Sequence, residues 1–185
     1  MRSTSRQSLF LFVIGGGLVL AAIAAFFALP EGQDSAQTIS ALAVPVPVHF
    51  TAPDIQLTDL GGRPVAFSDY KRQVILYNAW ATWCPPCKEE MPILEAYYQA
   101  HRQEGFVVIA IEDGEPLDEV AAYVKQMGLT FPVWPDLKWV ATESFGINNL
   151  PTSYVIDRSG VVRQMWRGAI TREALEQYVT PLLKE

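Results

Sequence analysis

The chain has 185 residues, half of them hydrophobic, and a formal net charge of −6. This length accommodates one domain with a short appendage, and nine Phe and five Trp provide for a sizeable core. The negative charge and the lack of a basic stripe argue against nucleic acid as a partner. The composition is also unlike that of a disordered chain.

The first thirty residues differ from the rest of the chain. Arg2 and Arg6 precede an uncharged apolar run from Leu9 to Leu29, which reaches the roughly 20 residues that a helix needs to cross a bilayer. A cleaved signal peptide is the alternative, but its apolar region usually spans only about 7–15 residues and ends at a small-x-small site. The segment from Pro30 to Asp34 offers no such site. We therefore expect an uncleaved transmembrane anchor at residues 9–29.

The distribution of charge around this run predicts the orientation of the chain. The positive charges lie before it, and Glu31 and Asp34 follow it. The positive-inside rule then places residues 1–8 in the cytoplasm and the remainder outside a bacterial cell membrane, with a single crossing. Residues 30–52 are predicted to be a linker, because polar residues give way to prolines that favour extended chain. The globular domain is expected to occupy residues 53–185.

The start of this domain shows strand patterns. Segments 55–58 and 64–67 alternate between apolar and polar or small residues on either side of the turn-rich residues 59–62, which predicts a β-hairpin. Continuous apolar runs follow at 74–77 and 106–111. Such runs are typical of strands that are buried on both faces of a parallel sheet.

Helical patterns occupy much of the remaining chain. Apolar residues recur at helical spacing from Leu117 to Val124 and predict an amphipathic helix that stops at Gly128. Thr171 is a good N-cap for a last helix, which Pro181 ends or kinks. The predicted helices are residues 84–103, residues 117–127, a short one at 140–145, and the one that Thr171 begins.

Residues 152–156 and 161–166 predict two strands paired across the turn-rich residues 157–160. The order of elements is then a β-hairpin, a strand, a helix, a strand, two helices, two strands and a helix. This order predicts an α/β fold in three layers, with a mixed central sheet and helices on both faces.

The only two cysteines, Cys84 and Cys87, lie where a buried-strand pattern passes into a helical one. The helix dipole and the free backbone N–H groups at such a junction favour a thiolate. Cys84, at the solvent-facing helix start, is the expected nucleophile, and Cys87 is expected to resolve the mixed disulfide. Pro85 and Pro86 stiffen the turn, and the absence of a histidine between the cysteines favours a reducing pair.

A zinc site and a purely structural disulfide are the alternatives for the cysteine pair. Zinc requires four ligands, and the only two histidines, His49 and His101, lie far apart in the sequence. A disulfide across so short a loop removes little entropy from the unfolded chain. Redox chemistry is therefore the favoured interpretation, and neither a metal nor a cofactor is expected.

The segment from Asn78 to Pro92, NAWATWCPPCKEEMP, resembles the active site of the thioredoxin superfamily. More closely, it resembles the membrane-anchored TlpA/ResA-like branch of bacterial thiol-disulfide oxidoreductases. The resemblance extends from about Ala52 to the C-terminus. It includes the N-terminal hairpin and a central insertion at residues 112–145. It implies a thioredoxin-like fold and a redox-active disulfide between Cys84 and Cys87.

The resemblance also implies roles for residues around the cysteines. The segment Leu150-Pro151-Thr152 matches a loop whose proline is cis in the family and packs against the disulfide. Leu150 would offer backbone groups to an extended partner chain. Pro92 matches a helix-kinking proline, and Asn78 stands where plain thioredoxins have a buried aspartate. Trp83 is expected to shield Cys84 and to contact partners, and Trp80 is expected in the core.

Glu90 matches a glutamate that this branch places near the sulfur atoms, where it moves protons or raises the thiol pKa values. The ordinary alternative is a solvated carboxylate in the run Lys88-Glu89-Glu90. Because Asn78 removes the usual buried proton acceptor, Glu90 becomes the candidate for that task.

The branch implies a membrane-tethered reductant of protein disulfides that keeps the haem-binding cysteines of apocytochrome c reduced. Electrons would come from a membrane-embedded thiol carrier of the CcdA/DsbD kind. The alternatives are an oxidant or isomerase-type partner for exported proteins, and a non-catalytic module that binds a client. A peroxidase is disfavoured, because related folds use Thr-x-x-Cys and Ala81 stands at the threonine position.

Overall fold

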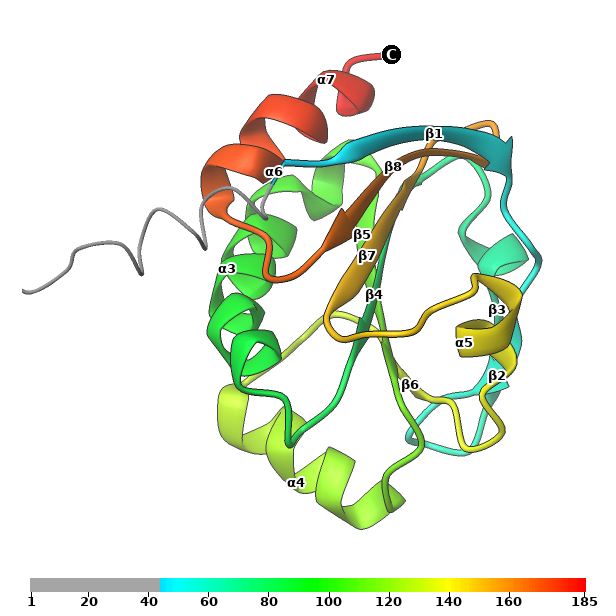
Figure 1. Ribbon diagram of the computed structural model, residues 1–185, viewed down its shortest axis with the longest axis vertical. Coiled ribbons are helices and arrows are strands. Elements are labelled where there is room, and N and C mark those ends of the chain that lie inside the picture. Colours follow the sequence, from blue (N-terminus) through cyan, green and yellow to red (C-terminus); the bar gives the residue numbers. More distant parts are fainter. Residues whose placement is uncertain (1–43) are drawn as a thin grey trace, which may run out of the picture. The chain divides into compact units, whose positions relative to one another are not determined.

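The computed structural model describes residues 44–185 (Figure 1). The expected cytoplasmic N-terminus at 1–8, the expected anchor at 9–29 and the linker residues up to 43 lie outside the described part of the chain. Within residues 44–185, none of the helices has both the length and the apolar character that a membrane crossing requires.

A mixed six-stranded sheet forms the middle of the domain, in the order β1-β8-β7-β4-β5-β6. The pairs β4/β5 and β5/β6 are parallel, and the pairs β4/β7, β7/β8 and β8/β1 are antiparallel. The mixed sheet was predicted, and it is confirmed. Its strands are β1 (Val46–Thr51), β4 (Val74–Trp80), β5 (Phe106–Glu112), β6 (Val133–Pro135), β7 (Thr152–Ile156) and β8 (Val161–Arg167).

Strands β4 and β5 occupy the centre of the sheet, and every residue of both is buried. Their continuous apolar sequences suit this position because helices or loops cover both faces. Strand β4 runs three residues beyond the predicted end at Tyr77 and finishes at Trp80. Its carboxyl end therefore delivers the chain directly to the loop that carries Cys84.

One face of the sheet is covered by helices that lie together in Figure 1. Helix α3 ends in a short 3₁₀ turn, η2, before Gly105, and α4 ends at Gly128 as predicted. Buried residues such as Met91 and Leu94 of α3 join Leu175 in one hydrophobic cluster against this face. The elements are α3 (Pro85–His101), η2 (Arg102–Glu104), α4 (Leu117–Met127), α6 (Arg172–Tyr178) and α7 (Thr180–Leu183).

The opposite face is covered by α5 (Val140–Ser144), by the two-stranded hairpin β2 (Gln56–Thr58) and β3 (Pro64–Ala66), and by the 3₁₀ helix η1 (Phe67–Tyr70) (Figure 1). A second hydrophobic cluster fills this side and is rich in aromatic rings. Ring pairs in it include Tyr77 with Phe145, whose centroids lie 4.8 Å apart. The three layers and the hairpin are thus as predicted.

The structure corrects the start of the domain. Residues 46–51, which the proline pattern predicts to be linker, form β1 and pair with β8, so the sheet begins at residue 46 and not at 53. Strand β1 lies at the edge of the sheet, where a proline such as Pro47 is tolerated. Most of its residues are exposed, so the alternation that signals a strand is missing. The short edge strand β6 was also not predicted.

Candidate active site

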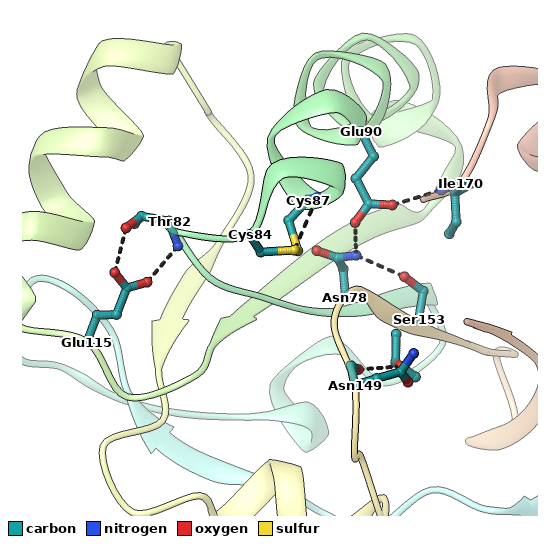
Figure 2. Close-up of a disulfide and its surroundings, with 10 residues drawn as sticks. Asn78, Thr82, Cys84, Cys87, Glu90, Glu115, Asn149, Ser153 and Ile170 are labelled. Carbon is teal, nitrogen blue, oxygen red and sulfur yellow. Dashed lines mark hydrogen bonds between the residues drawn. A yellow bond between two sulfur atoms is a disulfide. The ribbon is translucent and has the colours of Figure 1, made fainter. Parts of the chain in front are cut away.

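Cys84 and Cys87 form a disulfide at the junction between β4 and α3, as the resemblance implied. Cys84 is the N-cap of α3, and its Sγ accepts a hydrogen bond of 3.3 Å from the backbone N–H of Cys87 (Figure 2). The first N–H groups of a helix have no partner within the helix and favour negative charge. The same N–H group will stabilise a thiolate on Cys84 when the disulfide is reduced.

The expectation of a solvent-facing Cys84 needs correction for the oxidised protein. Cys84 is only 3% exposed, and Cys87 is fully buried. Pro85 and Pro86, which lie between the cysteines, are exposed, and so is Trp83, which precedes Cys84 and is 63% exposed. The ring of Trp83 is therefore available to partners, whereas Trp80 is buried in the core as expected. Pro92 lies on the exposed side of α3, which continues through it.

Glu90 is fully buried, so it is not a surface carboxylate. Its Oε1 accepts a hydrogen bond of 2.8 Å from Asn78 Nδ2, and its Oε2 accepts one of 2.8 Å from the backbone N–H of Ile170 (Figure 2). Burial raises the pKa of Glu90 from its ordinary value of 4.5 to about 8, although both hydrogen bonds favour the ionised form. The carboxyl group can therefore gain or lose a proton near neutral pH.

Asn78 joins Glu90 to the sheet. Its Nδ2 also donates to Ser153 Oγ at 2.9 Å, because Ser153 of β7 lies opposite Asn78 in the antiparallel β4/β7 pair. The Oδ1 atom of Asn78 is buried and has no hydrogen-bond partner within residues 44–185. Sequence reasoning missed Ser153, since only the register between two distant strands brings it to this position.

The loop before β7 has the backbone form that the resemblance implied. The peptide bond between Leu150 and Pro151 is cis, and the backbone N–H of Gly168 donates to Pro151 O at 2.8 Å. The hydroxyl of Thr152 turns back onto the loop and donates to Asn149 O at 2.8 Å. Leu150 is half-buried against the hydrophobic clusters of the domain.

Glu115 was not predicted to belong to this site. Its carboxylate accepts hydrogen bonds from the backbone N–H of Thr82, at 2.6 Å, and from the Thr82 hydroxyl. In Figure 2 this pair lies on one side of the disulfide and the pair of Asn78 and Glu90 on the other. A usable signal was present, because acidic residues directly follow β5, and the carboxyl ends of the parallel strands β4 and β5 meet at one edge of the sheet.

A second carboxyl group, that of the buried Glu112, accepts a hydrogen bond of 3.0 Å from the backbone N–H of Glu115. Burial raises the pKa of Glu112 to about 8, and the negative charge of Glu115 contributes. Within residues 44–185 no group of His, Cys, Asp and Glu side chains is arranged to hold a metal ion.

Comparisons with known proteins agree with this geometry. A model of the AhpC/TSA family matches residues 48–165. The thiol-disulfide oxidoreductase ResA of Geobacillus kaustophilus (strain HTA426) is 37% identical over 134 residues, which are 72% of this chain and 77% of that protein. ResA of Bacillus subtilis (strain 168) is 30% identical over 69% of this chain and 72% of its own length.

A solved structure shows the same fold. The crystal structure of a putative thiol:disulfide interchange protein DsbE from Chlorobium tepidum has a TM-score of 0.69 and 30% identity, and the match covers 73% of this chain and 96% of that one. The family match, the ResA relatives and the Cys84–Cys87 disulfide at the start of α3 agree. The chain therefore belongs to the AhpC/TSA family, and it is a ResA-like thiol-disulfide oxidoreductase of the thioredoxin superfamily.

Proposed function

We propose that this oxidoreductase is tethered to the cell membrane by residues 9–29 and reduces disulfides of exported proteins, apocytochrome c among them. The observation that carries the proposal is the Cys84–Cys87 disulfide at the start of α3, with the buried carboxyl group of Glu90 three residues later on the same helix. A membrane-embedded thiol carrier of the CcdA/DsbD kind would supply the electrons that reduce the Cys84–Cys87 disulfide again after each reaction. The ResA relatives support the redox chemistry, and the apolar run supports the tether.

The cysteine pair performs the reaction in two exchange steps. The Cys84 thiolate attacks one sulfur of the client disulfide and forms a mixed disulfide, while the second client sulfur leaves as a thiolate and takes up a proton. Cys87 then loses its proton and attacks Cys84 Sγ. This attack releases the first client sulfur as a thiolate, which takes up a proton from water. The client has then gained two electrons, and the enzyme, which has lost them, contains the Cys84–Cys87 disulfide.

Glu90 is suited to the proton transfer of the second step. A group transfers protons most effectively when its pKa lies near the working pH, and the pKa of Glu90 is about 8. Glu90 follows Cys87 at a spacing of three residues, which places the two side chains on the same side of α3. In this scheme Glu90 accepts the proton of Cys87 and returns it after re-reduction.

Trapping of clients tests the substrate class. The reduced Cys87→Ser variant should stall as a mixed disulfide on Cys84, and mass spectrometry should identify exported proteins with paired cysteines, apocytochromes c included. Cys84→Ser is the matched control, and it should trap little. Recovery of exported proteins without any apocytochrome c would remove the link to cytochrome c maturation.

An isomerase or oxidant is the second candidate, because the crystal structure of a secreted thiol-disulfide isomerase from Corynebacterium glutamicum matches at 25% identity with a TM-score of 0.66. The reduction potential separates the two. A value near or below about −270 mV supports a reductant, and one near about −120 mV supports an oxidant.

Fractionation tests the tether. The full chain, expressed in a bacterium, should sediment with the membranes and resist carbonate extraction. A soluble product that begins near Asp34 would show that residues 9–29 are a cleaved signal peptide.

A further inference from the structure

A groove of about 290 Å³ lies beside the active site. Trp83, which precedes Cys84, and Leu150, which precedes the cis proline, line it from the two active-site loops. Trp139 and Asp113 line it from the segment between β5 and β7. Because Trp83 is adjacent to Cys84 and Leu150 is adjacent to the cis proline, the groove is placed to contact a client next to the reacting sulfur.

Two tryptophans of the groove are exposed to solvent, Trp83 by 63% and Trp139 by 52%. Trp139 also has a φ of 54°, in the left-handed region that side-chain-bearing residues rarely adopt. Its indole lies against the backbone of Gly114, where an added Cβ would be only 3.4 Å from Trp139 Nε1. Core packing does not account for a large ring held outward on a strained backbone, and such strain gathers at binding sites.

Among the described residues, Asp113 is the one acidic residue that lines the groove, and the carboxylates of Glu115 and Asp136 lie near Asp113 outside this lining. Asp113 accepts a hydrogen bond of 3.2 Å from the hydroxyl of Thr142, which also lines the groove. Burial raises the pKa of Asp113, and the nearby carboxylates of Asp136 and Glu115 raise it further. Asp113, Glu115 and Asp136 form no salt bridge with any residue between 44 and 185. A positive group in the groove would relieve this repulsion.

We propose that the groove binds a basic side chain, arginine above all, that lies a few residues from the reacting cysteine of an extended client polypeptide. The cation packs on the indole faces of Trp83 and Trp139, and Asp113 supplies the opposite charge. Arginine fits better than lysine because its guanidinium is planar, weakly hydrated and stacks on aromatic rings. The proposal rests on the reduction of protein disulfides proposed above and adds a rule for which disulfides are preferred.

The test uses the reduced full chain in detergent and three unstructured peptides. Each peptide has one cysteine blocked as a mixed disulfide with thionitrobenzoate, flanked two residues away on both sides by Arg, Gln or Glu. Release of thionitrobenzoate in a single turnover gives a second-order rate constant. We expect the Arg peptide to react about five-fold faster than the Gln peptide and the Glu peptide to be slowest. The differences should shrink in 0.5 M salt, because salt screens exposed charges.

Variants locate the effect in the groove. Trp139→Asn and Asp113→Asn should each slow the Arg peptide about three- to ten-fold and change the Gln peptide less than about two-fold. Asparagine is suited to position 139 because it tolerates the left-handed backbone. Leu137→Ala is the matched control, since Leu137 is 52% exposed on the same loop but lines a different hollow.

The outcomes separate this inference from the proposed function. Equal rate constants for the Arg and Gln peptides, or a variant that slows all peptides alike, would overturn the binding of a basic side chain. If none of the peptides releases thionitrobenzoate, the reduction of peptide disulfides itself fails.

Discussion

Asn78 and Glu90 are joined by a hydrogen bond of 2.8 Å, in which Asn78 Nδ2 donates to Glu90 Oε1, and neither residue is exposed. The bond connects the central strand β4 to the helix that carries Cys87. Because Ile170 also donates to the carboxyl group, Glu90 has a defined position although burial favours its neutral form. Protonation of this one side chain therefore affects both the stability of the fold and the chemistry of the thiols.

The stability of the oxidised protein should fall as pH rises. Glu90 has a pKa of about 8 in the folded protein and an ordinary value of 4.5. Between pH 4.5 and pH 8 the Glu90 carboxyl group is protonated in the folded protein and ionised in the unfolded chain. The resulting contribution to the free energy of unfolding is fully present below pH 4.5 and is lost as the pH rises through 8. We expect Glu90 alone to account for a loss of about 3–5 kcal/mol. Denaturant unfolding at pH 5 and pH 8 measures it.

Glu90→Gln isolates this contribution. Glu112 also has a raised pKa of about 8 and titrates over the same range, so the relevant quantity is the difference between wild type and variant. That difference should decline between pH 5 and pH 8. An equal pH dependence in both proteins would mean that Glu90 is ionised in the folded state at pH 5.

Glu90→Gln should also lower the pKa of at least one thiol in the reduced protein. An ionised carboxylate disfavours a nearby thiolate, and glutamine carries no charge. The absorbance of the thiolate against pH, in wild type and variant, gives the pKa values. Glu89→Gln is the matched control, because Glu89 is an exposed neighbour on the same helix. Superimposable curves for wild type and Glu90→Gln would exclude Glu90 from the proton path.

Cys84 should react with a limiting alkylating reagent well before Cys87. The backbone N–H of Cys87 points at Cys84 Sγ from the first turn of α3 and stabilises a thiolate there. Cys87 is fully buried and lies within α3, whereas Cys84 is its N-cap. Mass spectrometry of the reduced, partly alkylated protein measures the order. Preferential labelling of Cys87 would reverse the proposed roles of the two cysteines.

Glu115→Ala should destabilise the protein by about 1.5–3 kcal/mol, the range for hydrogen bonds to a charged group. The variant removes the acceptor for both the backbone N–H and the hydroxyl of Thr82. Chemical denaturation at pH 7 provides the measurement. Thr82→Val should cost less because the backbone bond remains, and Glu119→Ala, at an exposed position of α4, should cost little. A Glu115→Ala protein as stable as wild type would mean that this contact does not hold the loop.

Local patterns predicted much of the fold. The apolar runs at β4 and β5 identified strands buried on both faces, and the apolar spacing with Gly128 located α4 from Leu117 to Met127. Both signals lie within one element, so no knowledge of its neighbours was needed. Strand β1 could not be predicted in this way. It is a mostly exposed edge strand, and it forms because it pairs with β8, more than a hundred positions away in the sequence.

The sequence by itself determined the redox pair, because Cys84 and Cys87 are the only cysteines and share one helix turn at the end of a buried strand. It also proposed Glu90, through a resemblance, but left a surface carboxylate equally open. Only the tertiary structure decided between these, since the burial of Glu90 depends on Asn78 from β4 and on Ile170 from the chain before α6. The same holds for Ser153 and Glu115. Contacts between residues far apart in the chain follow from strand register and loop packing, and no local pattern encodes them.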